Sequence, residues 1–411
     1  MIILNVIAGI FYAASIIYAG YYVVTSVGTF KKTKKLPQGT KKHKFGVIIA
    51  ARNESVVIGN LIKSINEQNY GSDLIDIYVF PNNCTDDTAK VAKEAGAAIL
   101  ECDVPIHSKG DALNEIFSQF NAKDHDYDAF CIFDADNLVH PDFFNQMNNA
   151  LCNGADAAQG YRESKNAGDS WISAGTTIYY WIINGFYNRS RQNIGQSGMF
   201  NGTGFMLSRR VLDDIGWHTY TMTEDIEYSA QLAIHGYKID WVADAVVYDE
   251  QPILFGQSWH QRRRWSTGTI QCMTRYFWPL VASLKQKRKM FSLDMAFLFI
   301  APVIQIISIL PSIGLAINAL SGIRETGIPW LILLVGMAVS TVVAYLVVTA
   351  MTYLVIIKEK KQPGKVLSGI FTFWLFMMSW LPINIICFLS KEYTWKSIEH
   401  TKSVDITEMM Q

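Results

Sequence analysis

The sequence predicts an α/β domain, built on a mostly parallel sheet and flanked by transmembrane α-helices. Two observations lead to this prediction. Apolar stretches at both ends of the 411-residue chain are long enough to cross a bilayer, and the region between them alternates strand-like and helix-like patterns. The hydrophobic content of 50% and the aromatic content of 13% are both high for a soluble protein. We therefore expect one domain that is tethered to a membrane at both ends.

The N-terminal stretch, residues 1–27, is almost wholly apolar and carries tyrosines near its far end. It has no basic n-region and no small-residue cleavage site, so we expect a retained transmembrane helix rather than a signal peptide. Residues 28–44 form a basic juxtamembrane linker, and a second basic run, residues 285–289, precedes the next apolar stretch. The positive-inside rule then predicts a cytoplasmic domain, residues 45–285, on a multi-pass protein of the plasma membrane.

The C-terminal region, residues 286–411, is predicted to contain two or three transmembrane or re-entrant helices and a short tail. Residues 291–320 and 329–357 each exceed a bilayer span, whereas residues 366–390 are interrupted by Pro382. Three full spans would place the tail outside the cell. A re-entrant last segment would keep it in the cytosol, and the sequence leaves both arrangements open.

Polar residues follow the predicted strands of the central domain. Residues 45–51 and 75–80 have the composition of buried strands, and each is followed by a polar loop and a helical pattern. Ligands of open α/β sheets bind at such carboxyl ends of strands. Further on, Lys109 and Gly110 open a helix that can hold an anion. The absence of Gly-x-Gly-x-x-Gly and Walker-type loops disfavours a dinucleotide enzyme or a P-loop ATPase.

The central stretch of the domain, residues 130–137, is a buried strand that ends in Asp134 and Asp136. Strand alternation points these two carboxylates the same way, with the small Ala135 between them. Neighbouring carboxylates repel each other unless a cation lies between them, and such oxygen ligands suit Mg²⁺ or Mn²⁺. The alternative is a strand end with two solvated acids.

The second half of the domain is richer in aromatic and charged motifs. Residues 171–187 are predicted to form an aromatic, amphipathic helix that either belongs to the core or faces lipid or an apolar acceptor. A glycine-rich segment at residues 201–206 follows. Glu224 and Asp225 then open a helix that Thr223 can cap, although acids in a first turn are ordinary.

Three consecutive arginines, Arg262 to Arg264, lie between Gln261 and Trp265. Helix amphipathicity does not explain such a run, because neighbouring residues on a helix point about 100° apart. Guanidinium groups bind phosphate oxygens and an indole face can stack on a sugar. A nucleic-acid patch is the alternative, but it fits poorly with a tethered domain in a chain of formal net charge zero. We therefore expect no nucleic-acid partner.

Taken in order, these motifs resemble those of family 2 glycosyltransferases, and most of all the membrane-embedded bacterial type similar to hyaluronan, cellulose and poly-N-acetylglucosamine synthases. The resemblance covers about residues 45–271. It implies a GT-A type, Rossmann-like fold and an inverting sugar transfer from a nucleotide donor, with a UDP-sugar as the expected donor and Mg²⁺ or Mn²⁺ as the cofactor. The expected partners are this donor, membrane lipid, and a polysaccharide or lipid acceptor.

The resemblance also implies roles for individual residues. Asp134 and Asp136 match the metal-binding pair, and Asp225, beside Glu224, matches the catalytic base that deprotonates the acceptor hydroxyl. The residues expected to bind the nucleotide sugar are Ala51, Arg52, Glu54, Asn82, Lys109, Asp134, Gln261, Arg264 and Trp265. The residues expected to bind the acceptor are Asp225, Trp265, Gly202 and Thr203. Arg262 or Arg263 is expected to support the diphosphate.

The sequence departs from the family pattern after the second strand, where Pro81 and Asn82 stand in place of the usual aspartates. Asn82 can donate and accept hydrogen bonds but has no charge, so the preference for uridine is less secure. The acceptor also stays open between a growing polysaccharide and a lipid that receives a single sugar. A channel for a polymer could require a second copy or a partner subunit. The alternative from another class is a membrane protein whose cytosolic domain only senses a nucleotide sugar.

Overall fold

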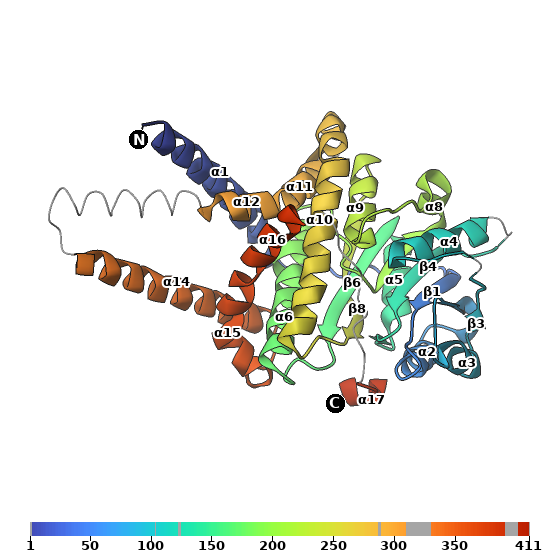
Figure 1. Ribbon diagram of the computed structural model, residues 1–411. Coiled ribbons are helices and arrows are strands. Elements are labelled where there is room, and N and C mark those ends of the chain that lie inside the picture. The colour runs from blue at the N-terminus through green and yellow to red at the C-terminus, as the bar shows by residue number, and fades with distance from the viewer. Residues whose placement is uncertain are drawn as a thin grey trace.

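The computed structural model describes residues 2–102, 104–121, 125–286, 289–309, 330–390 and 402–410. At its centre lies an eight-stranded sheet with the strand order β3-β2-β1-β4-β7-β6-β8-β5 (Figure 1). The strands are β1 (Phe45–Ala51), β2 (Ile75–Pro81), β3 (Ala98–Ile99), β4 (Ala129–Asp134), β5 (Leu138–Val139), β6 (Ala157–Ser164), β7 (Phe205–Ser208) and β8 (Ile239–Asp249).

The sheet is parallel where strands and helices alternate along the chain. β3, β2, β1 and β4 run parallel to one another, and β6 runs parallel to β8. β7 runs antiparallel to both β4 and β6, and β5 antiparallel to β8. The predicted α/β class with a mostly parallel sheet is confirmed, and β1 has the predicted bounds.

Helices cover both faces of the sheet. α2 (Ile58–Asn66), α3 (Thr88–Glu94) and α5 (Phe143–Cys152) pack against one face, and α4 (Lys109–Asn121), α8 (Arg209–Ile215) and α9 (Glu224–Ile234) against the other. Alternation along β4 supplies both cores, because Cys131 and Phe133 face the first layer while Phe130 and Ile132 face the second. Because β1, β2 and β4 run parallel, their carboxyl ends lie at the same edge of the sheet.

The aromatic segment that the sequence left open between core and lipid is a core helix. α6 (Trp171–Ile182) begins at a capping box made by Ser170 and Ser173, and a π-helical turn, η3 (Ile183–Arg189), and the short α7 (Ser190–Asn193) follow it. α6 packs against α15 (Leu367–Met378), where Ile178 and Phe376 are fully buried. The amphipathic pattern therefore serves the junction between the domain and the apolar helices.

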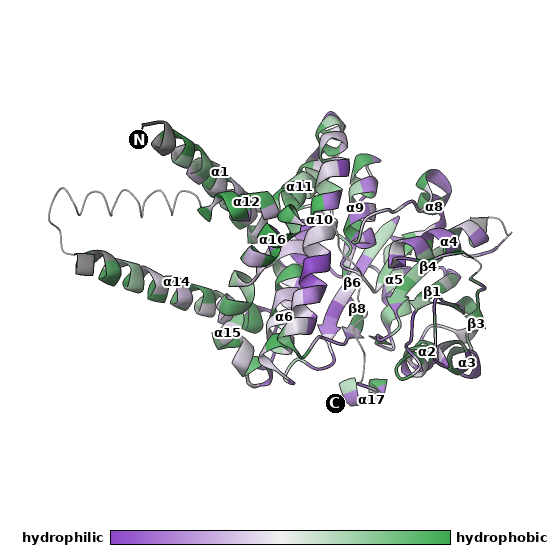
Figure 2. Ribbon diagram, in the orientation of Figure 1, coloured by the Kyte–Doolittle hydropathy of each residue, from purple (hydrophilic) through white to green (hydrophobic). Residues whose placement is uncertain are grey.

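Two apolar helices project away from the domain: α1 (Ile2–Ser26) and α14 (Trp330–Lys358) (Figures 1 and 2). Among the described residues, three helical stretches are long and apolar enough to cross a membrane, namely Val6–Phe30, Leu334–Lys358 and Pro363–Leu389. A fourth candidate is the pair α11 (Lys289–Phe299) and α12 (Ala301–Ile307), which is bent by 47°. The part of the predicted span 291–320 that follows residue 309 lies outside the described residues.

The last apolar stretch packs more closely against the domain than the other two do. α15 and α16 (Trp380–Leu389) lie against α6 and against α10 (Phe255–Ser283). One third of the most apolar part of this stretch is buried, compared with none of the most apolar parts of the other two stretches. The tail beyond it also contacts the domain. Lys402 Nζ lies 2.6 Å from Asp169, and Ile406 in α17 (Ile406–Met409) is buried. This tail placement favours the re-entrant alternative.

Candidate active site

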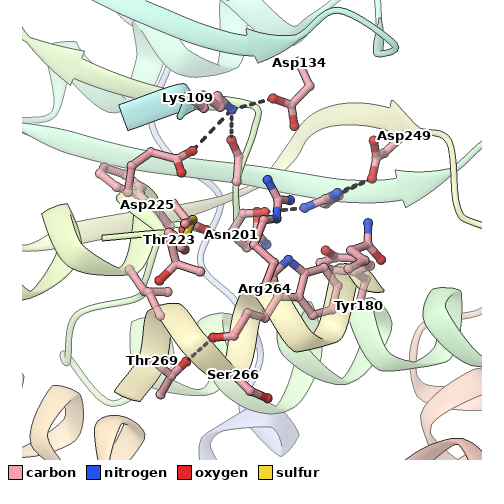
Figure 3. A pocket seen from close by; sticks show the side chains of 18 of the residues that line it. Lys109, Asp134, Tyr180, Asn201, Thr223, Asp225, Asp249, Arg264, Ser266 and Thr269 are labelled. Carbon is pink, nitrogen blue, oxygen red and sulfur yellow. Dashed lines mark hydrogen bonds and ion pairs between the residues drawn. The ribbon is translucent and has the colours of Figure 1, made fainter. Parts of the chain in front are cut away.

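A cavity of about 400 Å³ opens at the carboxyl edge of the sheet and continues toward the apolar helices (Figure 3). Its walls come from the ends of β1, β2, β4 and β8, the first turns of α4 and α9, the middle of α10, and α6. This is the position in which open α/β sheets bind ligands, and the volume falls within the range of small-molecule sites.

The end of the cavity at β1 and β2 carries Arg52, Glu54 and Asn82. Asn82 is buried, and both its backbone N–H and its side-chain Nδ2 donate to the carbonyl of Ala51, at 2.9 and 3.1 Å. Ala51 was expected to contact the nucleotide, but its side chain lies in the hydrophobic core. Only its backbone contributes, by fixing Asn82.

Lys109 links the acids on opposite sides of the cavity. Its ammonium group donates to Asp134 Oδ1 and, at 2.7 Å, to the carbonyl of Gly202, and it lies 3.6 Å from Glu224 Oε1 (Figure 3). Burial disfavours its charge, but Asp134 and Glu224 together raise the pKa of Lys109. Residues from α4, β4, the glycine-rich loop and α9 are therefore brought together at one point.

The glycine-rich loop supports the carboxylate pair from behind. Thr203 is fully buried, and its hydroxyl accepts a hydrogen bond from the backbone N–H of Asp134 at 2.9 Å and donates to Asn137. Thr203 was expected to contact the acceptor, yet its hydroxyl faces Asp134 and Asn137, and the residue does not line the cavity. Gly202 does line it, through the carbonyl that Lys109 contacts.

Asp134 and Asp136 both line the cavity and offer the oxygen donors that a hard divalent cation requires. Asp136 is 3% exposed and accepts a hydrogen bond from the backbone N–H of Glu250 at 3.2 Å. No group of three His, Cys, Asp or Glu side chains in the described parts of the chain is arranged to hold a metal ion. The pair therefore fits a cation whose other ligands come from water and substrate phosphates, as is usual for Mg²⁺.

The second acidic pair, Glu224 and Asp225, opens α9 and lines the cavity. Burial raises the pKa of both carboxyls, while the positive charges of Lys109 and Arg264 oppose this shift. Thr223 occupies the N-cap position, but its side chain makes no capping hydrogen bond, so the expected cap is wrong. A buried carboxylate with a raised pKa is a stronger base than an ordinary aspartate.

Glu227, one turn further along α9, holds the loop that leads into this pair. It is fully buried, and its carboxylate accepts hydrogen bonds from the backbone N–H groups of Tyr220 and Thr221 at 2.8 and 2.7 Å, and from Tyr276 at 2.7 Å. The sequence does not distinguish Glu227, because a third acid in a first turn is expected to stabilise the helix.

Helix α10 distributes the Gln–Arg–Arg–Arg–Trp run over different faces. Gln261, Arg264 and Trp265 line the cavity, as their spacing of three and four residues allows. Arg262 points the other way: it is fully buried and donates to the carbonyl of Phe376 and, at 2.5 Å, to Ser379 Oγ. The expected support of the diphosphate by Arg262 is therefore wrong, since Arg262 caps the end of α15. Arg263 also lies outside the cavity wall.

A buried ion pair that was not predicted from the sequence, Arg162–Asp249, also lines the cavity. Arg162 donates to Asp249 from Nε at 2.8 Å and from Nη2, and its Nη1 donates to the carbonyl of Asn201. The guanidinium carbon lies 4.0 Å from the centre of the Tyr180 ring (Figure 3). Asp249 ends a strand just as Asp134 does, which was a usable signal, whereas nothing in the sequence distinguishes Arg162.

Comparison with known proteins identifies this arrangement. Residues 43–268 match the model of the family described as glycosyltransferase like family 2. The chain belongs to glycosyltransferase family 2. The matched region includes the cavity residues named above, from Arg52 to Trp265.

Curated relatives are similar over the same region. The chain is 24% identical over 260 residues to the beta-monoglucosyldiacylglycerol synthase of Synechocystis, which covers 59% of this chain and 52% of that protein. It is 26% identical over 245 residues to the poly-beta-1,6-N-acetyl-D-glucosamine synthase of Staphylococcus epidermidis, which covers 58% of this chain and 57% of that protein. The chain thus aligns with little more than half the length of these relatives.

A solved structure extends the similarity in fold to the apolar helices. The mannosyltransferase of Pyrobaculum calidifontis, in complex with GDP-mannose and Mn²⁺, matches with a TM-score of 0.64 over 95% of this chain and 100% of that one. Sequence identity is 17%. The predicted GT-A fold is therefore confirmed.

Proposed function

We propose that this chain is an integral-membrane, metal-dependent glycosyltransferase that moves a sugar, with inversion, from a nucleotide donor to a hydroxyl acceptor. One observation carries the proposal: the Lys109 ammonium group contacts both Asp134 and Glu224, so the metal-type acids and the base-type acids share one cavity. That cavity also contains the phosphate-binding side chain of Arg264.

The donor would lie along the edge of the sheet. Arg52 and Asn82 would contact the nucleoside, while Asp134 and Asp136 would hold Mg²⁺ or Mn²⁺ together with the diphosphate. A bound cation would neutralise negative charge on the departing diphosphate. Lys109 and Arg264 would add charge-assisted hydrogen bonds to the same oxygens. A UDP-sugar is the expected donor, and other nucleotides belong in the test because Asn82 carries no charge.

Asp225 would act as the general base. It accepts the proton of the acceptor hydroxyl, whose oxygen attacks the anomeric carbon as the bond to the diphosphate breaks. Because attack and departure occur on opposite faces of the sugar ring, the anomeric configuration inverts. Trp265 would form the acceptor side of the site together with Tyr179. The centres of the two rings lie 6.0 Å apart in a stacked arrangement.

We also propose that the catalytic domain is cytoplasmic and that the protein is multi-pass in the plasma membrane. The basic linker and the apolar helices α1 and α14 support this arrangement. The acceptor is a polysaccharide or a lipid, because the relatives include both a poly-N-acetylglucosamine synthase and a glycolipid synthase. A second copy or a partner subunit could complete a channel if the product were a polymer.

The test is release of nucleoside diphosphate by the purified protein in lipid vesicles, with a panel of UDP- and GDP-sugars and with Mn²⁺ or Mg²⁺. We expect turnover with one donor, its loss in EDTA, and a decrease of at least about 100-fold in Asp225→Asn, given the usual contribution of a general base. Asp244→Asn, an exposed acid on β8, is the matched control and should retain activity. Nucleotide binding without turnover of any donor would instead support the sensing alternative.

A further inference from the structure

The cavity does not end at Asp225. Beyond Trp265 it continues between the apolar helices, where its wall is formed by Leu298, Pro302, Gln305, Met377, Trp380 and Asn384. These residues belong to α11, α12, α15 and α16, which are parts of candidate membrane spans. α12 and α16 pack against each other near the point where α1 and α14 leave the domain (Figure 1). One continuous cavity therefore joins the nucleotide end to a membrane end.

The membrane end contains an amide pair in apolar surroundings. Asn384 is 2% exposed, and its Nδ2 donates to Gln305 Oε1 at 2.5 Å. Its Oδ1 atom is buried and has no hydrogen-bond partner within the described part of the chain. An unpaired polar atom in such a place is costly, and polar side chains inside apolar helices mark ligand sites. The Asn384 side chain is thus prepared for a ligand that donates a hydrogen bond.

Two polar atoms that α10 contributes to the cavity wall share this property. Gln261 Oε1 and Ser266 Oγ are buried, and neither has a partner among the described residues. A carbonyl oxygen accepts only, and a hydroxyl can accept as well as donate, so hydroxyl groups on a ligand would satisfy all three atoms. An ionised phosphate would not, because it offers acceptors alone.

The positions of the basic side chains along the cavity also favour a ligand without a phosphate. Its Arg and Lys side chains are those of Arg52, Lys109, Arg162 and Arg264, and all come from the domain. Over the described residues, none comes from α11, α12, α15 or α16. The membrane end therefore suits a neutral headgroup rather than an anionic one.

We propose that the acceptor is a neutral lipid with a free hydroxyl, whose headgroup enters from the membrane end and is held by Asn384 and Gln305. Its hydroxyl then faces Asp225, and the product is a glycolipid that carries one added sugar. This inference rests on the proposed glycosyl transfer. It selects the lipid acceptor over the growing polymer, because a cavity of about 400 Å³ leaves little room for a chain of sugars beside the donor.

The experiment uses the full chain in vesicles, its preferred nucleotide sugar, and Mn²⁺, with three acceptor arms: dioleoylglycerol, a polyprenyl phosphate, and no added lipid. We expect dioleoylglycerol to increase nucleoside diphosphate release by at least about tenfold, and mass spectrometry to show one added sugar. Asn384→Leu should raise the KM for dioleoylglycerol by at least about tenfold, the discrimination typical of a lost hydrogen bond in a buried site. The Kd for the nucleoside diphosphate with Mn²⁺ should stay within about twofold.

Ile385→Val, at a partly exposed position of the same helix, is the matched control and should leave both constants unchanged. Stimulation by the polyprenyl phosphate alone, or a polymeric product, would overturn the inference while leaving glycosyl transfer intact. An equal loss of nucleotide affinity in Asn384→Leu would overturn the role of Asn384 in holding the acceptor. Absence of donor turnover in every arm would contradict the proposed function itself.

Discussion

At the scale of single residues, the site depends on acids whose pKa is raised by burial. Glu224 and Asp225 lie side by side at the start of α9, and Lys109 and Arg264 supply the nearest positive charges. Asp134 has a different environment, because the backbone N–H of Asp134 is held by Thr203 and its carboxylate by Lys109. The different surroundings therefore allow one carboxylate pair to serve metal binding and the other proton transfer.

The raised pKa of Asp225 leads to a prediction about pH. An aspartate ordinarily has a pKa of 3.8, and burial raises that of Asp225. The base must be ionised, so activity is present above the raised pKa and is lost as the pH falls through it. We expect kcat/KM to decrease by about tenfold per pH unit on an acid limb whose midpoint lies above 3.8.

The same prediction can be tested by the pH midpoint of a variant at Arg264. Arg264→Gln removes a charge that lowers the pKa of both acids, so the midpoint measured on its residual activity should move to higher pH. Arg275→Gln, an exposed position on the same helix, should leave the midpoint in place. A midpoint at or below 3.8, or a move to lower pH in Arg264→Gln, would contradict Asp225 as the titrating base.

At the scale of elements, the approach of α10 to the start of α9 positions the proposed base. Gly268 makes this approach possible, because a Cβ atom there would lie 2.3 Å from Thr223 Oγ1 and 2.6 Å from its Cγ2. The next turns of α10 carry Arg264 and Thr269 into the same cavity. The distance between these two helices therefore sets the position of Asp225 relative to Arg264.

Gly268→Ala should consequently impair catalysis although alanine favours a helix. The added methyl group must displace Thr223 and the first turn of α9, and overpacking of this kind costs about 1–3 kcal/mol. We expect kcat to decrease by about tenfold or more, because misplacement of reacting groups is costly. Gly256→Ala on the same helix is the control, since nothing lies within 4 Å of its added Cβ. Equal activity of the two variants would show that the contact does not position the base.

At the scale of the whole molecule, the tail beyond α16 returns to the domain. Lys402 N–H donates to the Glu250 carboxylate at 3.3 Å, and Lys63 lies 2.5 Å from Asp405. Because Glu250 also lines the cavity, the tail lies close to the donor end of the site. A segment that contacts the catalytic domain must lie on the same side of the membrane.

This contact predicts the topology of the chain in a bacterial membrane. A green fluorescent protein fused after Gln411 should fluoresce, because it would remain in the cytoplasm with the catalytic domain. The same reporter fused before Met1 should not fluoresce, because α1 would carry it across the membrane. Alkaline phosphatase activity from a C-terminal fusion would mean that α15 and α16 form a complete span, and would contradict the re-entrant arrangement.

The sequence by itself determined the α/β class, the family and most of the charged residues of the cavity wall. Strand alternation and the polar ends of strands are local signals, and they placed Arg52, Asn82, Asp134 and Asp136 at one edge of the sheet. The order of the motifs along the chain indicated the family. The spacing of Gln261, Arg264 and Trp265 was equally local, because a helix brings residues three and four apart onto one face.

Only the tertiary structure decided which side chains face the cavity and which support it. Arg262 caps α15, Thr203 stands behind Asp134, and Glu227 anchors the loop before Asp225, each through partners far away in the sequence. The Arg162–Asp249 pair and the Asn384–Gln305 pair are likewise long-range. A local pattern cannot encode such contacts, because burial and hydrogen-bond partners are properties of the packed chain and not of any one segment of it.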